Sequence, residues 1–327
     1  MSLNAILSRL TVSTIGLTCK SFLSIGYCSS VTVNGLENLK AALQSSERNA
    51  GRGVITVSNH ISTLDDPVTW GVLPAHYFFS SRMTRWTLGA SDIMFTNPVF
   101  SAFFRKGQVL ETFRGTGIFQ PAIDTAICKL NNGAWVHLFG EGKVNQPGNE
   151  ATSSKTPLLL RFKWGVGRIL MEAHKPPIVV PMWLTGFEKL MPEGRSWPWK
   201  YLPRRQVALS VTFGKPIRDE SIKAALSGIG PLAANPCTDD SKHGLATQHE
   251  QSLGVGPGTQ NEVRSLDASE HGWMGDVVAR QVKVDAVPEQ ANELARETAR
   301  IRSAVTAVLH REVEALGRHV LGLDRKS

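Results

Sequence analysis

The chain of 327 residues and 35.7 kDa is long enough for one large α/β domain or two modest ones. Hydrophobic residues make up 42% and charged residues 20%, which is typical of a globular enzyme and unlike disordered, collagen-like or coiled-coil chains. None of the four cysteines forms a Cys-x-x-Cys pair, and no stretch reaches ~18 uninterrupted apolar residues. The sequence therefore predicts neither a zinc ribbon, a thioredoxin-type site, a disulfide scaffold nor a membrane-spanning helix.

Positive charge is concentrated in the first two thirds of the chain. Residues 1–220 hold 24 Lys and Arg against 14 Asp and Glu, whereas the remaining residues hold 12 against 14. This balance indicates an anionic partner, either nucleic acid or anionic lipid, or else a generically basic soluble protein. No RNA-binding, helix-turn-helix, zinc-finger or basic-zipper pattern favours nucleic acid.

The N-terminal segment, residues 1–28, contains two basic residues and no acid. Leu3, Ile6 and Leu10 fall at helical spacing and predict an amphipathic helix. Three interpretations are open: a mitochondrial targeting segment, an interfacial membrane helix, or a helix that packs on the main domain. We assign the main domain to residues 29–220.

Short β-rich runs then recur, each ending in a polar or glycine-bearing turn: 54–57, 77–79, 109–110, 135–139, 178–180 and 207–213. Segments with helical character, such as 117–131 and 157–173, lie between them. This alternation predicts an α/β fold with a mixed, largely parallel sheet flanked by helices. The chemically interesting residues follow the carboxyl ends of strands, where open α/β sheets bind their ligands.

The last third of the chain changes character twice. Residues 221–285 are rich in small polar residues, and we expect a disordered insertion there. Residues 286–327 regain a period of about 3.6 residues, which predicts a long amphipathic helix packed on the domain, with a membrane-surface role as the alternative.

The sharpest local motif runs from Asn59 to Pro67 and includes His60 and Asp65. A histidine just past a strand can serve as a general base, and a carboxylate on its other ring nitrogen fixes the tautomer. The alternative is a turn histidine followed by solvated first-turn acids. No Gly-x-Ser-x-Gly elbow is present, which favours direct attack by a substrate hydroxyl, and no further ligand cluster indicates a metal.

Two later turns carry residues suited to phosphate. In the block from Phe139 to Asn145, glycine allows close backbone approach and Lys143 can meet a phosphate, although the spacing is not that of a P-loop. Arg114 stands in a glycine-bearing turn and can make a bidentate phosphate contact. A solvated turn is the alternative for both.

These stretches, with the proline-bounded apolar strand at 176–183, resemble the glycerolipid acyltransferase superfamily in order and spacing: Asn-His-x4-Asp, an arginine turn, then Phe-x-Glu-Gly. The Asp-Asp-Pro after the histidine, the Glu-Gly-Lys-Val-Asn block and residues 161–168 are similar to the tafazzin family. The resemblance covers residues 30–218 and implies a fold like that of glycerol-3-phosphate acyltransferase. One departure is Gly140, which stands where the family usually has proline and is expected to loosen the turn by about 0.5–1 kcal/mol.

The resemblance implies a phospholipid–lysophospholipid transacylase that needs neither coenzyme A nor any other cofactor or metal. Its substrates would be cardiolipin, monolysocardiolipin and phosphatidylcholine, and nucleic acid is not expected as a partner. Two alternatives are an acyl-CoA-dependent lysophospholipid acyltransferase and a non-catalytic peripheral membrane-binding protein. The implied catalytic residues are His60 and Asp65, and the implied substrate-binding residues are Asn59, Arg114, Glu141, Gly142 and Lys143.

Within that site, Glu141 is expected to orient Lys143 or a glycerol hydroxyl, and turn amides near Gly142 are expected to stabilise an oxyanion. The resemblance also implies attachment without spanning at the intermembrane-space faces of the inner and outer mitochondrial membranes. Two apolar segments, 93–104 and 178–187, are the candidates for lipid contact.

Overall fold

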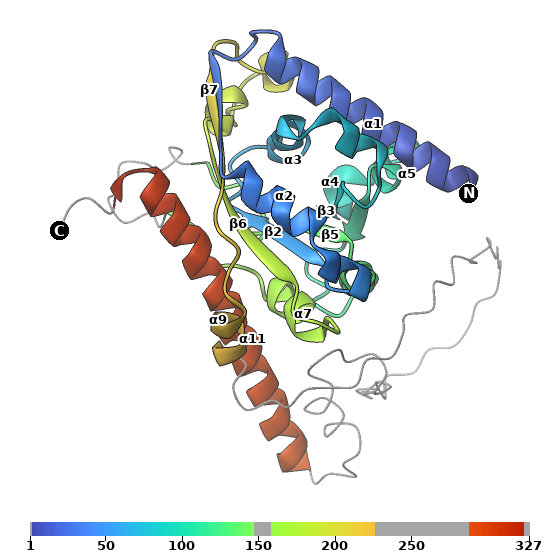
Figure 1. Ribbon diagram of the computed structural model, residues 1–327, viewed down its shortest axis with the longest axis vertical. Coiled ribbons are helices and arrows are strands. Elements are labelled where there is room, and N and C mark those ends of the chain that lie inside the picture. Colours follow the sequence, from blue (N-terminus) through green and yellow to red (C-terminus); the bar gives the residue numbers. More distant parts are fainter. Residues whose placement is uncertain (1, 147–157, 226–287, 324–327) are drawn as a thin grey trace, which may run out of the picture.

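The computed structural model describes residues 2–146, 158–225 and 288–323 (Figure 1). Its centre is a seven-stranded sheet with the order β1-β7-β6-β2-β5-β3-β4. Neighbouring strands are parallel except for the β6–β7 pair. The mixed, largely parallel sheet predicted from the sequence is therefore confirmed. The strands are β1 (Ser30–Asn34), β2 (Val54–Ser58), β3 (Arg85–Ala90), β4 (Val109–Thr112), β5 (Trp135–Phe139), β6 (Ile178–Thr185) and β7 (Ala208–Phe213).

Helices cover both faces of the sheet (Figure 1). The α-helices are α1 (Leu3–Ser24), α2 (Leu36–Gln44), α3 (Asp65–Thr69), α4 (Ser91–Met94), α5 (Pro98–Lys106), α6 (Pro121–Asn131), α7 (Trp164–Glu172), α8 (Phe187–Leu190), α9 (Asp219–Ala225) and α11 (Pro288–Val320). The 3-10 helices are η1 (Ser46–Ala50), η2 (Trp70–Val72), η3 (Ala75–Phe79) and η4 (Trp199–Tyr201).

Two hydrophobic clusters form the core, one on each face of the sheet. Strand β2 is buried throughout, so its side chains alternate between them. Ile55 and Val57 pack in one cluster with residues of α6, α7 and α11. Val54 packs in the other with α2, η2 and η3. This central, fully buried strand ends immediately before His60.

The two terminal helices both lie against the domain (Figure 1). Helix α11 packs on α7 and β6 with an apolar stripe that includes Ile301, Val305 and Leu309. Helix α1 contacts α3, α5, η2 and η3, and the Ser13 hydroxyl donates to the Phe78 carbonyl at 2.9 Å. Within the described ranges, no helix has the length and apolarity needed to cross a membrane.

Several details differ from the sequence predictions. Tyr77 to Phe79 form the end of η3 and not a strand, because the side chains of Tyr77 and Phe78 turn into the core beneath α1. Strands β1 and β3 were not predicted. Residues 221–225, expected in the disordered insertion, form the end of α9, and the rest of that insertion lies outside the described residues. The segment 178–187 is almost wholly buried in β6 and α8, which rules it out as a surface for lipid.

Candidate active site

The candidate site lies at the carboxyl edge of the parallel strands. Strands β2 and β5 are neighbours, with Ser58 paired to Phe139 at their ends. The chain leaving β2 carries His60 and the chain leaving β5 carries Glu141. Parallel pairing therefore brings the two motifs together although 81 residues separate them.

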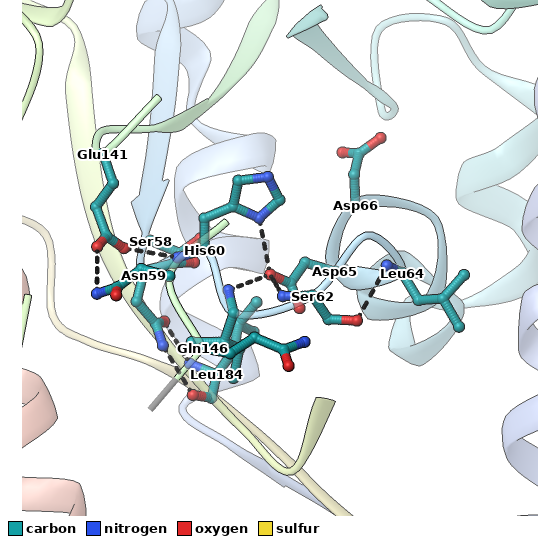
Figure 2. Close-up of polar contacts among 12 residues, drawn as sticks. Ser58, Asn59, His60, Ser62, Leu64, Asp65, Asp66, Glu141, Gln146 and Leu184 are labelled. Atoms are coloured by element: carbon teal, nitrogen blue, oxygen red, sulfur yellow. Dashed lines mark hydrogen bonds and ion pairs between the residues drawn. The ribbon is translucent and has the colours of Figure 1, made fainter. Parts of the chain in front are cut away.

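His60 and Asp65 form a hydrogen-bonded pair (Figure 2). His60 Nδ1 and Asp65 Oδ2 are 2.9 Å apart, and Asp65 is fully buried at the start of α3. Because a carboxylate only accepts hydrogen bonds, Nδ1 carries the proton and donates it. The Nε2 lone pair is then free to accept a proton from a substrate, and the His60 side chain remains 19% exposed.

The carboxylate of Asp65 is held by the turn that separates it from the histidine. Its Oδ2 accepts from the Ile61 amide at 2.6 Å and from the Ser62 amide at 2.8 Å, in addition to His60. Burial raises the pKa of the Asp65 carboxyl, outweighing the lowering by His60 and the two amides. The turn needed to bring residues five apart onto one side of the chain is therefore built by the same carboxylate that orients the imidazole.

Glu141 holds the backbone of His60 from the opposite side (Figure 2). Its Oε1 accepts from the His60 amide at 2.9 Å, and its Oε2 accepts from the Leu160 amide at 3.0 Å and the Asn145 side-chain amide at 2.9 Å. The Asn145 backbone amide donates to the His60 carbonyl at 2.6 Å. Both Glu141 oxygens are thus occupied by donors other than Lys143, so the expected orientation of Lys143 by Glu141 is not what the structure shows. Burial raises the pKa of the Glu141 carboxyl.

Asn59 is also buried, and its side chain bridges to the neighbouring strand β6. Its Oδ1 accepts from the Leu184 amide at 2.8 Å and its Nδ2 donates to the Leu184 carbonyl at 3.0 Å (Figure 2). An amide used in this way replaces a backbone ladder pair and fixes where the chain turns from β2 toward His60. Asn59 has no exposed polar atom directed at a ligand in this arrangement.

An aromatic and polar layer lies beneath the imidazole. The ring of Phe139 contacts His60 on one side and the buried ring of His137 on the other. His137 Nδ1 and the Thr56 hydroxyl are 2.9 Å apart. Burial, followed by smaller effects of neighbouring charges, lowers the pKa of His137 to about 3, so this imidazole is neutral and supports the site as a fixed aromatic group.

The second aspartate of the motif takes no part in the His60 pair. Asp66 forms an ion pair with Arg85 at the start of β3, and its Oδ1 accepts from the Trp70 indole at 3.0 Å. Burial alone would raise the pKa of Asp66, but Arg85 and Trp70 outweigh it and hold the pKa below the usual value. The pair therefore fixes α3 against β3, next to the catalytic turn.

The expected phosphate ligands are more exposed and more widely spread. Gly142, with φ of 68°, and Lys143 form an exposed turn directly after Glu141. The Gly142 amide donates to the Phe139 carbonyl at 3.1 Å, so this particular amide is not available to an oxyanion. Arg114 follows β4, three strands from β2, or about 14 Å at the usual strand spacing, and pairs with Asp92 at 3.2 Å.

The structure thus brings His60, Asp65 and Glu141 into one hydrogen-bonded cluster and leaves Arg114 at its edge. Sequence reasoning did not assign roles to Phe139 or Asn145, although both stand in the block quoted for its Glu-Gly pair. Their positions two residues before and four residues after Glu141 are the signal that marks them. The contacts themselves depend on the β2–β5 pairing.

Comparisons with known proteins agree with this geometry. A family model described as acyltransferase matches residues 30–185. The chain is 36% identical over 212 residues to taffazin of Dictyostelium discoideum, covering 64% of this chain and 68% of that protein. It is 38% identical over 267 residues to tafazzin of Saccharomyces cerevisiae, covering 69% of each. It is 40% identical over 220 residues to N-acylphosphatidylethanolamine synthase of Arabidopsis thaliana, covering 66% of this chain and 70% of that protein. The crystal structure of a 1-acyl-sn-glycerophosphate acyltransferase from Thermotoga maritima aligns with a TM-score of 0.42 at 22% identity, covering 64% of this chain and 68% of that one.

Proposed function

This chain belongs to the tafazzin family of acyltransferases, and we propose that it exchanges acyl chains between a phospholipid and a lysophospholipid without coenzyme A. The observation that carries the proposal is the His60–Asp65 pair at 2.9 Å, which leaves Nε2 as a base at the surface of the site. The sequence offers no serine or cysteine elbow to form an acyl-enzyme, so the attacking group is a hydroxyl of the lipid itself.

In the proposed reaction, His60 Nε2 removes the proton from the free hydroxyl of the lysophospholipid. The oxygen attacks the ester carbonyl of the donor lipid, and the carbonyl oxygen becomes an oxyanion. Asp65 stabilises the imidazolium that forms and keeps it oriented. The imidazolium then returns its proton to the oxygen of the departing lysolipid, so that one ester replaces another and the enzyme is restored.

We assign the exposed turn after Glu141 to the negative charges of the substrates. The Lys143 amide has no hydrogen-bond partner among the described residues, and it takes the oxyanion role expected for Gly142. The Lys143 ammonium is positioned for a headgroup phosphate, and Arg114 for a phosphate farther along the same edge. Glu141 and Asn59 act by fixing the backbone on either side of His60.

The closing experiment measures transfer of a labelled acyl chain from phosphatidylcholine to monolysocardiolipin in detergent micelles from which coenzyme A has been removed. His60→Ala is expected to lower kcat by about 10²–10⁴-fold, the usual contribution of a general base. Asp65→Asn is expected to lose activity to a similar extent, because the amide no longer holds Nδ1–H.

The matched control is His76→Ala, which removes an exposed histidine on η3. It should leave transfer unchanged. A folded His60→Ala protein with wild-type rates would refute the mechanism. Activity that appears only when acyl-CoA is supplied would instead identify the acyl-CoA-dependent alternative, and vesicle binding without exchange the non-catalytic one.

A second candidate differs in the atom that receives the acyl chain. The relative from Arabidopsis thaliana is named for synthesis of N-acylphosphatidylethanolamine, in which the acceptor is an amine nitrogen. The same His60 base can deprotonate an ammonium headgroup acceptor. Supplying phosphatidylethanolamine beside monolysocardiolipin separates the two, because an amide product survives mild alkaline methanolysis and an ester does not.

We further propose cardiolipin remodelling at the intermembrane-space faces of the mitochondrial membranes as the setting of the reaction. The support is the similarity to tafazzins, together with the acid-free N-terminal segment and the basic first two thirds of the chain. Fractionation of mitochondria, followed by protease treatment of intact and opened outer membranes, tests this placement.

A further inference from the structure

Three segments far apart in the sequence share an unusual charge composition. Residues 2–25, 98–106 and 195–205 together contain eight Lys and Arg and no Asp or Glu. The whole chain, by contrast, has 36 basic and 28 acidic residues. Each segment also exposes large apolar or aromatic side chains, so the composition is not that of an ordinary solvated surface.

Helix α1 presents the longest of these apolar stripes. Leu3, Ile6, Leu10 and Leu17 recur at helical spacing and are all exposed, and Ile25 beyond the helix end is 71% exposed. The opposite side of α1, with Val12 and Gly16, is the buried side. The helix is therefore apolar on both its inner and outer faces, and the inner face alone is covered by the domain.

Helix α5 continues the stripe at one end of α1. The two helices are in contact, and the Ser8 hydroxyl donates to the Lys106 carbonyl at 2.8 Å. Val99, Phe100 and Phe103 of α5 are exposed, Val99 at 74%. All the apolar residues of this helix are at least partly exposed, because no residue of α5 is buried.

The loop around η4 flanks the other end of α1 (Figure 1). The Tyr27 hydroxyl donates to the Pro203 carbonyl at 2.6 Å, and the Arg205 guanidinium lies over the Tyr27 ring. Trp197, Trp199, Tyr201 and Leu202 of this loop are all exposed, Trp197 at 76%. Exposed Trp and Tyr interspersed with basic residues are typical of the region between lipid headgroups and acyl chains.

We propose that α1, α5 and the loop 195–205 form one docking face for an anionic bilayer surface, with α1 lying in the plane of the headgroups. This face deepens the proposed function, because it names the surface from which the lipid substrates are taken. The apolar stripe would enter the interface, and the basic residues would meet lipid phosphates at its margins. Each Lys or Arg near an anionic bilayer contributes about 1 kcal/mol.

Charge favours lipid over a second copy of this chain as the occupant. An isologous dimer through this face would place eight cations against eight cations with no carboxylate on the face to compensate. An anionic bilayer supplies the missing negative charge and also accepts scattered aromatic side chains without requiring shape complementarity.

The face also lies beside the catalytic turn. Helix α1 contacts α3, and α3 begins at Asp65. Helices α4 and α5 follow the carboxyl end of β3, which is the edge of the sheet that carries His60. Docking through this face therefore holds the open edge of the site close to the bilayer, where both lipid substrates reside.

The test is sedimentation of the full chain with vesicles of phosphatidylcholine and cardiolipin, or of phosphatidylcholine alone. Replacing Lys200, Arg204 and Arg205 by Ala is expected to weaken binding to the anionic vesicles roughly 100-fold and to leave the weaker binding to neutral vesicles nearly unchanged. Replacing Leu10, Phe100 and Trp199 by Ser is expected to weaken binding to both by at least tenfold.

Matched controls come from α11 and the residues after it, away from this face. The triple variant Arg296→Ala, Arg300→Ala and Arg311→Ala removes equally exposed charges, and Leu321→Ser with Leu323→Ser removes exposed apolar groups. Both controls should bind vesicles as the wild type does. Thermal unfolding of every variant confirms that these surface changes leave the fold intact.

The outcomes separate this proposal from the proposed function. Face variants that keep wild-type exchange in detergent micelles but lose exchange on vesicles support the docking face. Vesicle binding by the face variants that equals the wild type would overturn it, as would a face variant that dissolves a dimer without changing vesicle binding. If the wild type binds vesicles through this face but exchanges no acyl chains in micelles, the docking face stands and the proposed function fails.

Discussion

The imidazole of His60 lies nearly parallel to the ring of Phe139, with 4.0 Å between the ring centroids and 21° between the planes. Phe139 is the last residue of β5, so the position of the base is referred to a strand of the sheet and not to its own loop alone. A stacked ring restricts rotation of the imidazole, and its face attracts the imidazolium that forms during proton transfer.

Replacement of Phe139 by Leu should therefore lower kcat and leave KM nearly unchanged. A cation–π contact of about 0.5–2 kcal/mol corresponds to a 2- to 30-fold loss. Phe139→Tyr keeps the aromatic face and should retain most of the activity. Steady-state transfer in micelles, with both substrates varied, provides kcat and KM. Equal kcat for the Leu and wild-type proteins would show that the ring contributes nothing beyond packing.

Glu141 and Lys143, two residues apart, should give opposite kinetic signatures. In Glu141→Gln the new amide group confronts backbone N–H donors from Leu160 and His60, so we expect kcat to fall about 10- to 100-fold with little change in KM. In Lys143→Ala the turn persists but the cation is lost, so KM should rise while kcat is kept. A Glu141→Gln protein altered in KM alone would restore Glu141 to direct substrate binding.

The elements that the sequence predicted well are those whose burial is continuous. Strands β2 and β5 read as apolar runs because both of their faces are covered. Strand β1 has exposed side chains at four of its five residues and no apolar pattern to mark it. Strand β3 begins with Arg85 and includes Gly89, and neither residue is typical of a strand.

The site divides in the same way between local and distant contacts. The His60–Asp65 pair was predictable because a single turn brings together two residues five apart. The contacts of Glu141 with His60 and of Asn59 with Leu184 cross 81 and 125 residues, and they arise from strand pairing. A single sequence identifies Glu141 and Asn59 by motif, but only the sheet order shows that they hold the backbone of the base.

Gly140, which stands where the family usually has proline, is accommodated by its neighbour Phe162. A Cβ built at position 140 would lie 2.5 Å from the Phe162 ring. The expected loosening of the turn is therefore offset by a buried aromatic ring that covers the glycine. Gly140→Ala should reduce the free energy of unfolding by about 1–3 kcal/mol through overpacking.

A double-mutant cycle with Phe162→Leu tests this explanation. The smaller side chain makes room for the added methyl group, so the double variant should be more stable than the sum of the two single effects predicts. Chemical denaturation of the four proteins gives the coupling free energy. Additive effects would mean that the glycine is required for a reason other than the ring.

Buried His137 should make the protein sensitive to acid well above the pH at which carboxylates titrate. Its pKa is about 3 in the folded protein against an ordinary 6.5, so below pH 6.5 the unfolded chain binds a proton that the folded chain refuses. Its stabilising contribution is complete above pH 6.5, and the free energy of unfolding should fall by about 1.4 kcal/mol per pH unit between pH 6 and 4. Denaturation of wild type and His137→Gln across this range gives the two slopes. The variant should lack this part of the slope, whereas His76→Gln, at an exposed site, should keep it. Parallel curves for wild type and His137→Gln would mean that His137 accepts a proton in the folded state.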